Sequence, residues 1–133
     1  VIVWDKLHWT SGDLRYYGNQ TEVVIFAVKG VHELRWGQRQ GNVWRVPTVS
    51  ILNNEGNWDN PTQKPEELIH KAVELSSDVG QIVVDPFCGS GTTAAVAKRL
   101  GRNFYTGDIS AYQVEMANER LATVKIERLQ RTT

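Results

Sequence analysis

A glycine-rich turn in the second half of the chain reads Asp85-Pro86-Phe87-Cys88-Gly89-Ser90-Gly91-Thr92-Thr93. The residues before it, 81–85, form a short apolar run that predicts a buried strand. The residues after it, 92–100, predict a helix that ends at Gly101. Glycines let the backbone approach a ligand where a Cβ would collide, and the helix N-terminus offers unpaired N–H groups. The turn is therefore a candidate binding site.

The pattern of strands and helices continues on both sides of this turn. Residues 103–107 predict a second strand, and Ser110 with Gln113 three residues later predicts the start of a long helix. Upstream, Pro65 at the first helical position, followed by two acidic residues, predicts a helix that Gly80 ends. Strand, helix, strand and helix in this order make a βαβ unit, which closes right-handed onto a parallel sheet. The predicted fold class is α/β, with a Rossmann-like half over residues 61–133.

An acidic residue, Asp108, ends the second predicted strand, 19 residues after Gly89. A carboxylate at this place can accept hydrogen bonds from both hydroxyls of a ribose, which points to a ligand containing adenosine. A P-loop is excluded because Thr-Thr, and not Lys followed by Ser or Thr, comes after Gly91. Gly89-x-Gly91-x-x-Ala94 fits a dinucleotide, but Asp85 would then face a pyrophosphate. Its carboxylate suits the ammonium and sulfonium groups of S-adenosylmethionine; a tight packing turn is the alternative without a ligand.

Composition limits what the chain can be. Its 133 residues, with 15 Lys and Arg against 15 Asp and Glu, fit one soluble domain of zero net charge. No apolar run approaches the roughly 18 residues that a membrane helix needs, so no membrane partner is expected. The single cysteine excludes an intrachain disulfide and argues against a zinc cluster, and the expected compartment is the cytoplasm. The chain begins at Val1 without a methionine, and we expect it to be a piece of something longer.

The first 60 residues have a different character. Residues 1–6 and 22–29 predict a pair of strands, and residues 31–60 predict an irregular loop with a short strand at 43–46. Between 29 and 45, four basic residues against one acidic residue give a net charge of +3, with Trp36 and Trp44 among them. Such a segment can contact DNA, or it can be a solvated basic loop whose tryptophans pack on the domain. The candidate DNA-binding residues are Arg35, Trp36, Arg39 and Arg45.

Three segments carry a resemblance to a known family. They are the turn from Asp85 to Thr93, the upstream segment Asn60-Pro61-Thr62-Gln63-Lys64-Pro65, and the downstream segment Gly107-Asp108-Ile109-Ser110. In this order they resemble the cofactor motifs of the DNA amino-methyltransferases that modify adenine N6 or cytosine N4. The family usually has a histidine where this chain has Asn60, so no role is carried over to that position. The strong resemblance covers roughly residues 58–121.

The resemblance implies S-adenosylmethionine as cofactor, double-stranded DNA as substrate, and a role for each matching residue. The methionine half of the cofactor would be wrapped by the turn, and Asp85 would lie near its amino group. Asp108 would hold the ribose. The residues implied in cofactor binding are Thr62, Lys64, Asp85, Phe87, Gly89, Ser90, Gly91, Thr92 and Asp108, with Thr62, Lys64 and Thr92 at the carboxylate.

The family's catalytic motif, a polar residue followed by Pro-Pro and an aromatic residue, is absent, because the four prolines of this chain all stand apart. The resemblance places that motif before Val1. The chain then corresponds to the cofactor half of an adenine (less often cytosine) methyltransferase, with strands missing from its sheet and little activity expected alone. Strand 81–85 would present an unpaired edge, to be covered by the upstream part on another chain, a second copy or a rearranged strand. A noncatalytic binding module and an NAD-type domain are the alternatives.

Overall fold

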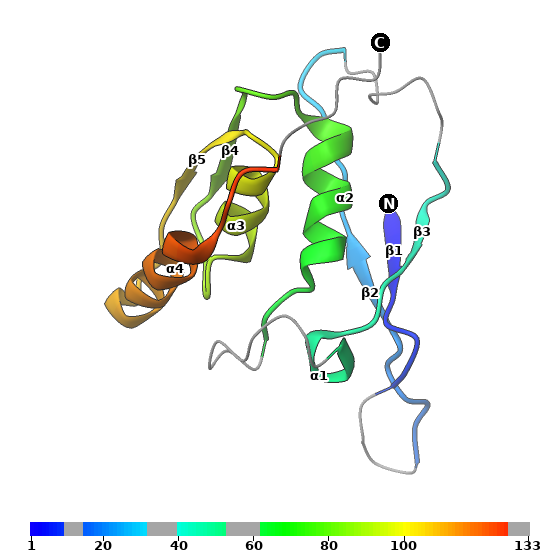
Figure 1. The fold of residues 1–133 in the computed structure, drawn as a ribbon. Coiled ribbons are helices and arrows are strands. Elements are labelled where there is room, and N and C mark those ends of the chain that lie inside the picture. The colour runs from blue at the N-terminus through cyan, green and yellow to red at the C-terminus, as the bar shows by residue number, and fades with distance from the viewer. Residues whose placement is uncertain (10–14, 32–39, 53–61, 128–133) are drawn as a thin grey trace.

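The computed structural model describes residues 1–9, 15–31, 40–52 and 62–127. The first half contains strands β1 (Ile2–Asp5), β2 (Thr21–Val24) and β3 (Val43–Arg45), followed by the short helix α1 (Val49–Leu52). The second half contains α2 (Glu66–Ser76), β4 (Ile82–Asp85), α3 (Thr92–Arg99), β5 (Asn103–Thr106) and α4 (Ala111–Thr123). Figure 1 shows α2 between the strands of the first half and the remaining elements of the second. The predicted α/β class is confirmed.

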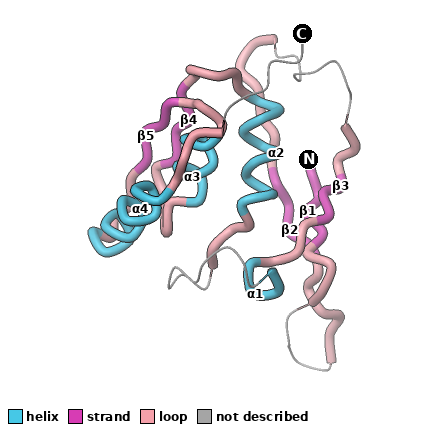
Figure 2. Tube along the Cα trace, viewed as in Figure 1, coloured by secondary structure: helices cyan, strands magenta, loops and turns pink. Residues whose placement is uncertain are grey.

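The strands form two separate sheets. In the first, β1 is antiparallel to β2 and parallel to β3, in the order β2-β1-β3. In the second, β4 and β5 are parallel neighbours, with Val83 opposite Phe104. The predicted antiparallel pair and the predicted parallel βαβ unit are therefore both present (Figure 2).

The predicted extension of the second strand to residue 29 is wrong, because β2 ends at Val24. Val24 lies opposite Ile2, where β1 begins, so the residues that follow have no partner backbone on β1. Apolar and β-branched residues alone do not keep a segment in a strand when it has no neighbouring strand to pair with. The short strand expected near residues 43–46 is present as β3.

Helix α2 begins one residue after its predicted start and ends several residues before its predicted end. Pro65 is the residue before the first helical position, with ψ 138°, and Glu66 opens the helix. The C-terminal end lies at Ser76 instead of near Gly80, because Ser77 is extended and its backbone is held from outside. Arg102 donates to the carbonyl oxygen of Ser77 at 2.7 Å and to its Oγ at 3.2 Å. The end of α2 is therefore set by the guanidinium of Arg102, and not by Gly80 as predicted.

The predicted start of α4 is confirmed. The side chain of Ser110 accepts a hydrogen bond from the backbone N–H of Gln113 at 3.4 Å, which caps the helix.

Both hydrophobic clusters of the described residues use α2. On one face, Leu68 and Leu75 pack with aromatic and aliphatic residues of the first sheet, namely Trp4, Trp44 and Val46. On the other face, Val73 packs with Val96 and Leu100 of the α3 segment. Helix α2 thereby fixes the first half of the chain to the half that carries the glycine turn.

The second sheet has helices on one face. Val83 packs toward the α3 cluster, whereas Ile82, Val84 and Tyr105 on the opposite face are 57%, 67% and 69% exposed. Within the described residues, β4 pairs with β5 alone, as the predicted open edge requires. No helix in the described residues is long and apolar enough to cross a membrane.

Candidate functional site

The turn after β4 is held in place from both ends. The carboxylate of Asp85 accepts the N–H of Phe87 at 3.0 Å, and the N–H of Cys88 donates to the carbonyl of Gly107 at 2.8 Å. Gly91 closes the turn with φ +78°, and a Cβ added there would lie 2.7 Å from the Cβ of Ala117. Gly91 therefore serves two needs, a left-handed backbone and close contact with α4.

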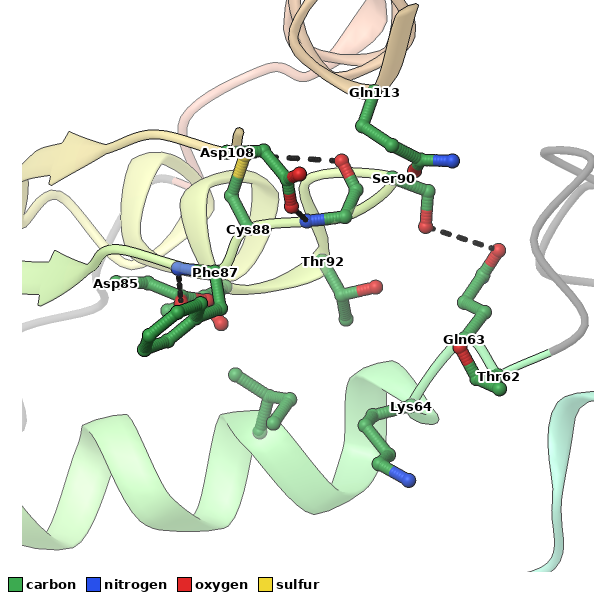
Figure 3. Close-up of a pocket in the computed structure, with 13 residues that line it drawn as sticks. Thr62, Gln63, Lys64, Asp85, Phe87, Cys88, Ser90, Thr92, Asp108 and Gln113 are labelled. Atoms are coloured by element: carbon green, nitrogen blue, oxygen red, sulfur yellow. Dashed lines mark hydrogen bonds between the residues drawn. The ribbon is translucent and has the colours of Figure 1, made fainter. Parts of the chain in front are cut away.

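Asp108 joins the end of β5 to this turn. Its two oxygens accept the N–H of Ser110 and the N–H of Gly89, each at 3.0 Å. Figure 3 shows Asp108 beside the turn. The hydrogen bond from Ser110 and the one from Gly89 hold the pKa of Asp108 below its ordinary value. Asp108 is therefore ionised at neutral pH. Each of its oxygens retains capacity for a further donor.

A cavity of about 410 Å³ lies over the turn, a size typical of small-molecule sites. Its lining comes from the segment before α2, from the turn, from the start of α3 and from the α4 side: Thr62, Gln63, Lys64, Ile69, Asp85, Phe87, Cys88, Gly89, Ser90, Thr92, Thr93, Asp108 and Gln113. Apart from Gly91, which packs against α4, every residue implied in cofactor binding lies on this lining.

The lining contains two glutamines that the sequence analysis did not predict as site residues. Gln63 Nε2 and Gln113 Oε1 are buried, and neither has a hydrogen-bond partner among the described residues. Figure 3 shows them on different sides of the cavity, Gln63 before α2 and Gln113 on α4. Buried amide atoms without partners are costly, so a ligand that supplies an acceptor and a donor would relieve the cost. In the sequence, the place of Gln63 next to Lys64 indicates a role in the site. Gln113 has only the signal of a helix start, because it follows Ser110 by three residues.

Lys64 reaches the cavity with its stem, while its ammonium group is held elsewhere. Nζ lies 3.2 Å from a carboxylate oxygen of Glu22 on β2 and 5.5 Å from the ring centre of Trp4. In Figure 3 this nitrogen points away from the turn. A ligand carboxylate would have to draw Lys64 from Glu22, which also pairs with Lys6.

Cys88 also lines the cavity but is no nucleophile at neutral pH. Burial, and then the charges of Asp108 and Asp85, raise the pKa of its thiol. The sulfur therefore stays protonated, and the surroundings of the turn favour cations over anions.

The candidate DNA-binding residues lie in a different part of the chain. Arg35, Trp36 and Arg39 fall outside the described residues. Arg45 ends β3, where its side chain is 74% exposed and its Nε lies 3.7 Å from Asp5. Trp44 agrees with the alternative in which a tryptophan of this segment packs on the domain: it is 7% exposed, in the cluster packed on α2.

The comparisons with known proteins agree on one family. A family model described as DNA methylase matches residues 1–119. The type II methyltransferase M2.DpnII of Streptococcus pneumoniae is 34% identical over 135 residues, covering 90% of this chain and 49% of that protein. The DNA adenine methyltransferase YhdJ of Escherichia coli (strain K12) is 46% identical over 81 residues, covering 61% of this chain and 27% of that protein. The chain thus spans about half the length of M2.DpnII and about a quarter of the length of YhdJ.

A solved structure supports the same grouping. The complex of M1.HpyAVI with SAM matches with a TM-score of 0.68 at 28% identity, over 90% of this chain and 60% of that one.

Proposed function

This chain belongs to the DNA methylase family, and on that basis we propose that it forms the S-adenosylmethionine-binding part of a DNA amino-methyltransferase. The observation that carries the proposal is the cavity over the turn, where Asp85, Asp108 and the glycine turn meet the Thr62–Lys64 segment. We propose methyl transfer to the exocyclic amine of adenine. The similarity to a DNA adenine methyltransferase favours adenine over cytosine.

The residues of the cavity fit this cofactor. Asp108, held ionised, suits the ribose hydroxyls, and Asp85 suits the positively charged methionine end. The unpartnered Gln113 Oε1 can accept an N–H and Gln63 Nε2 can donate, which matches a ligand with both kinds of group. S-adenosylmethionine supplies a methyl group on a positively charged sulfur. The residues of this chain would bind and orient it, with Thr62, Lys64 and Thr92 at its carboxylate.

The sequence of this chain has no Pro-Pro pair, and therefore lacks the motif that holds a flipped base. We infer that the 133 residues bind the cofactor but have little methyltransferase activity on DNA by themselves. The half of the relatives that this chain does not match is proposed to supply the missing residues and to cover the open edge of β4. DNA contact is proposed for residues 31–60, with Arg35, Trp36, Arg39 and Arg45 as its basic and aromatic groups.

Isothermal titration with S-adenosylhomocysteine and with NAD tests cofactor binding. We expect saturable binding of the first and none of the second. Asp108→Asn should weaken binding at least about tenfold, because one charged hydrogen-bond acceptor is worth roughly 1.5–3 kcal/mol. Asp5→Asn is the matched control: Asp5 also accepts a backbone N–H, from Leu7 at 2.9 Å, and it is not part of the cavity lining. Binding of NAD alone would sink the proposal.

Methyl transfer is tested separately with tritiated cofactor and duplex DNA. The chain alone should give almost no labelled adenine. Addition of the half of M2.DpnII that this chain does not match should restore labelling. Cofactor binding without labelling in that mixture would favour a noncatalytic binding module. Full activity of the chain alone would show that another segment replaces the missing motif.

A further inference from the structure

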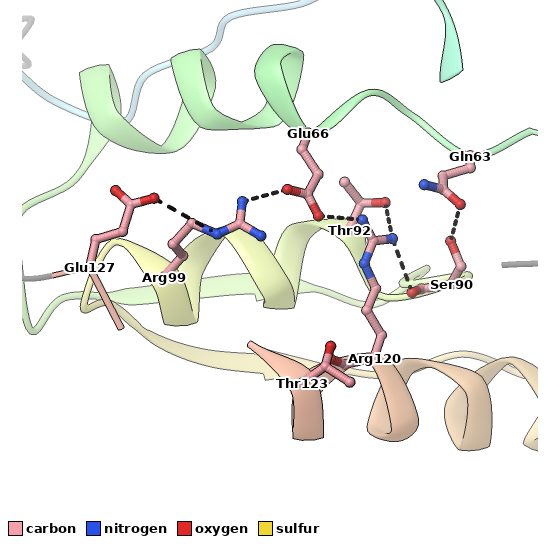
Figure 4. A network of polar contacts seen from close by, with 8 residues as sticks. All are labelled: Gln63, Glu66, Ser90, Thr92, Arg99, Arg120, Thr123 and Glu127. Atoms are coloured by element: carbon pink, nitrogen blue, oxygen red, sulfur yellow. Dashed lines mark hydrogen bonds and ion pairs between the residues drawn. The ribbon is translucent and has the colours of Figure 1, made fainter. Parts of the chain in front are cut away.

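A buried guanidinium lies against the glycine turn, outside the cavity lining. Arg120 of α4 is 2% exposed and contacts three residues from two segments that are distant in the sequence (Figure 4). It donates to Thr92 Oγ1 at 3.0 Å, to the carbonyl of Ser90 at 3.4 Å and to Glu66 Oε1 at 2.6 Å. Ser90 and Thr92 belong to the cavity lining, whereas Arg120 does not.

The charge of Arg120 needs compensation at this place. Thr92 is the first residue of α3, and a helix N-terminus repels a cation. Glu66, the first residue of α2, provides the compensation by bonding Arg120 with one oxygen and Arg99 with the other. Burial raises the pKa of Glu66, but the hydrogen bonds from Arg99 and Arg120 outweigh it and hold the pKa below its ordinary value.

The contacts of Arg120 act on groups that the cavity uses. Thr92 Oγ1 accepts the N–H of Arg120, which leaves the hydrogen of the hydroxyl free to be donated to a ligand. The carbonyl of Ser90 is fixed at the middle of the turn. Glu66 follows the Thr62–Lys64 segment after a single residue, Pro65, so the same network ties that segment to the turn.

We propose that Arg120 is a positioning residue for the cofactor turn, acting through Ser90 and Thr92 and joined by Glu66 to the segment before α2. It lies outside the cavity lining and is not proposed as a catalytic residue. The inference rests on the proposed cofactor site, and it adds a residue of α4 that neither the motifs nor the cavity lining contains.

Arg120→Lys tests the proposal, because lysine keeps the charge and loses the fork that reaches two segments at once. Arg102→Lys is the matched control: Arg102 is 8% exposed and bonds the carbonyls of Ser77 and Leu100, at the opposite end of α3. We expect Arg120→Lys to raise the Kd for S-adenosylhomocysteine about tenfold or more. Arg102→Lys should lower the Tm while leaving that Kd within about twofold. Equal Kd values in both variants would overturn the proposal.

Hydrogen exchange without any cofactor provides a second, independent readout. Backbone amides of residues 89–92 should exchange faster in Arg120→Lys and at the wild-type rate in Arg102→Lys. This comparison decides the role of Arg120 even if the wild-type chain binds no S-adenosylhomocysteine, an outcome that would defeat only the proposed function. Should Arg120→Lys fail to fold, Glu66→Gln, which keeps one acceptor, must show the same faster exchange at 89–92. Unchanged exchange there would refute the positioning role.

Discussion

At the scale of single residues, the second half of the chain is organised by one carboxylate between two guanidinium groups. Glu66 pairs with Arg99 and with the buried Arg120, so its charge compensates the guanidinium that lies against the glycine turn. Removing one partner of a buried ion pair leaves the other charge without compensation, which costs more than the pair itself contributes.

Glu66→Gln should therefore destabilise the chain by about 2–4 kcal/mol at pH 7. The folded pKa of Glu66 lies below its ordinary 4.5, so its stabilisation is complete above that pH and is lost as the pH falls through the folded value. Urea unfolding from pH 7 to pH 3 should show the difference between wild type and variant shrinking below pH 4.5. The adjacent Glu67→Gln, which removes an exposed pair with Lys71, should cost less than about 0.5 kcal/mol. A difference independent of pH would contradict this account of Glu66.

Gly91 offers a second test at the residue scale. Alanine at this position meets both a left-handed backbone and the Cβ of Ala117 at 2.7 Å. We expect Gly91→Ala to cost about 2–4 kcal/mol. Gly80→Ala isolates the backbone part, since Gly80 has φ +83° with nothing within 4 Å of the added Cβ, and should cost about 1–2 kcal/mol. Equal losses of unfolding free energy in the two variants would mean that the turn moves away from α4 without cost.

The site residues that the sequence could predict are those with a local signal. The turn and Asp108 combine glycines and an acid at a spacing that reports their chemistry, and they meet in the cavity. Arg120 has no such signal, because it lies 54 positions from Glu66 and only the packing of α4 brings them together. For Trp44 the local sequence is misleading. Its polar neighbours suggest an exposed side chain, but it pairs with Trp4 in the first sheet and is buried.

At the scale of elements, α2 has the central place. It packs through Leu68 and Leu75 on the first sheet and through Val73 on α3, so the two halves of the chain share one helix. Its apolar face was predictable from the sequence, and its start lies one residue after the predicted Pro65. Its end was not, because Arg102 sets it from 25 residues away. Element ends that depend on distant side chains carry no local signature.

Val73→Ala tests whether α2 makes the two halves one cooperative unit. All five tryptophans precede α2, at positions 4, 9, 36, 44 and 58, so their fluorescence reports on the first half of the chain. Among the described residues, Val73 belongs to the second-half cluster, and its truncation should cost about 1–3 kcal/mol. We expect thermal unfolding followed by tryptophan fluorescence and by far-ultraviolet circular dichroism to shift by the same amount. Separate transitions would show that the halves unfold independently.

At the scale of the whole molecule, the second sheet carries helices on one face and exposed apolar side chains on the other. A two-stranded parallel sheet with this composition is not expected to stand open, because parallel sheets are normally covered on both faces. The chain spans 49% of M2.DpnII, and the unmatched half of such a relative has the length needed to cover the face and the edge of β4.

Val84→Lys puts a charge on this open face, at a side chain that is 67% exposed. It should change the stability of the isolated chain by less than about 0.5 kcal/mol, because nothing in the described chain packs there. It should, however, abolish assembly with the unmatched half of M2.DpnII, since burial of an unpaired ammonium is unfavourable. Light scattering after size exclusion measures assembly, and Val31→Lys, at a loop valine that is 98% exposed, is the control. Assembly of Val84→Lys as strong as that of Val31→Lys would place the docking surface elsewhere. Self-association of the wild-type chain, lost in Val84→Lys, would instead identify a second copy as the cover.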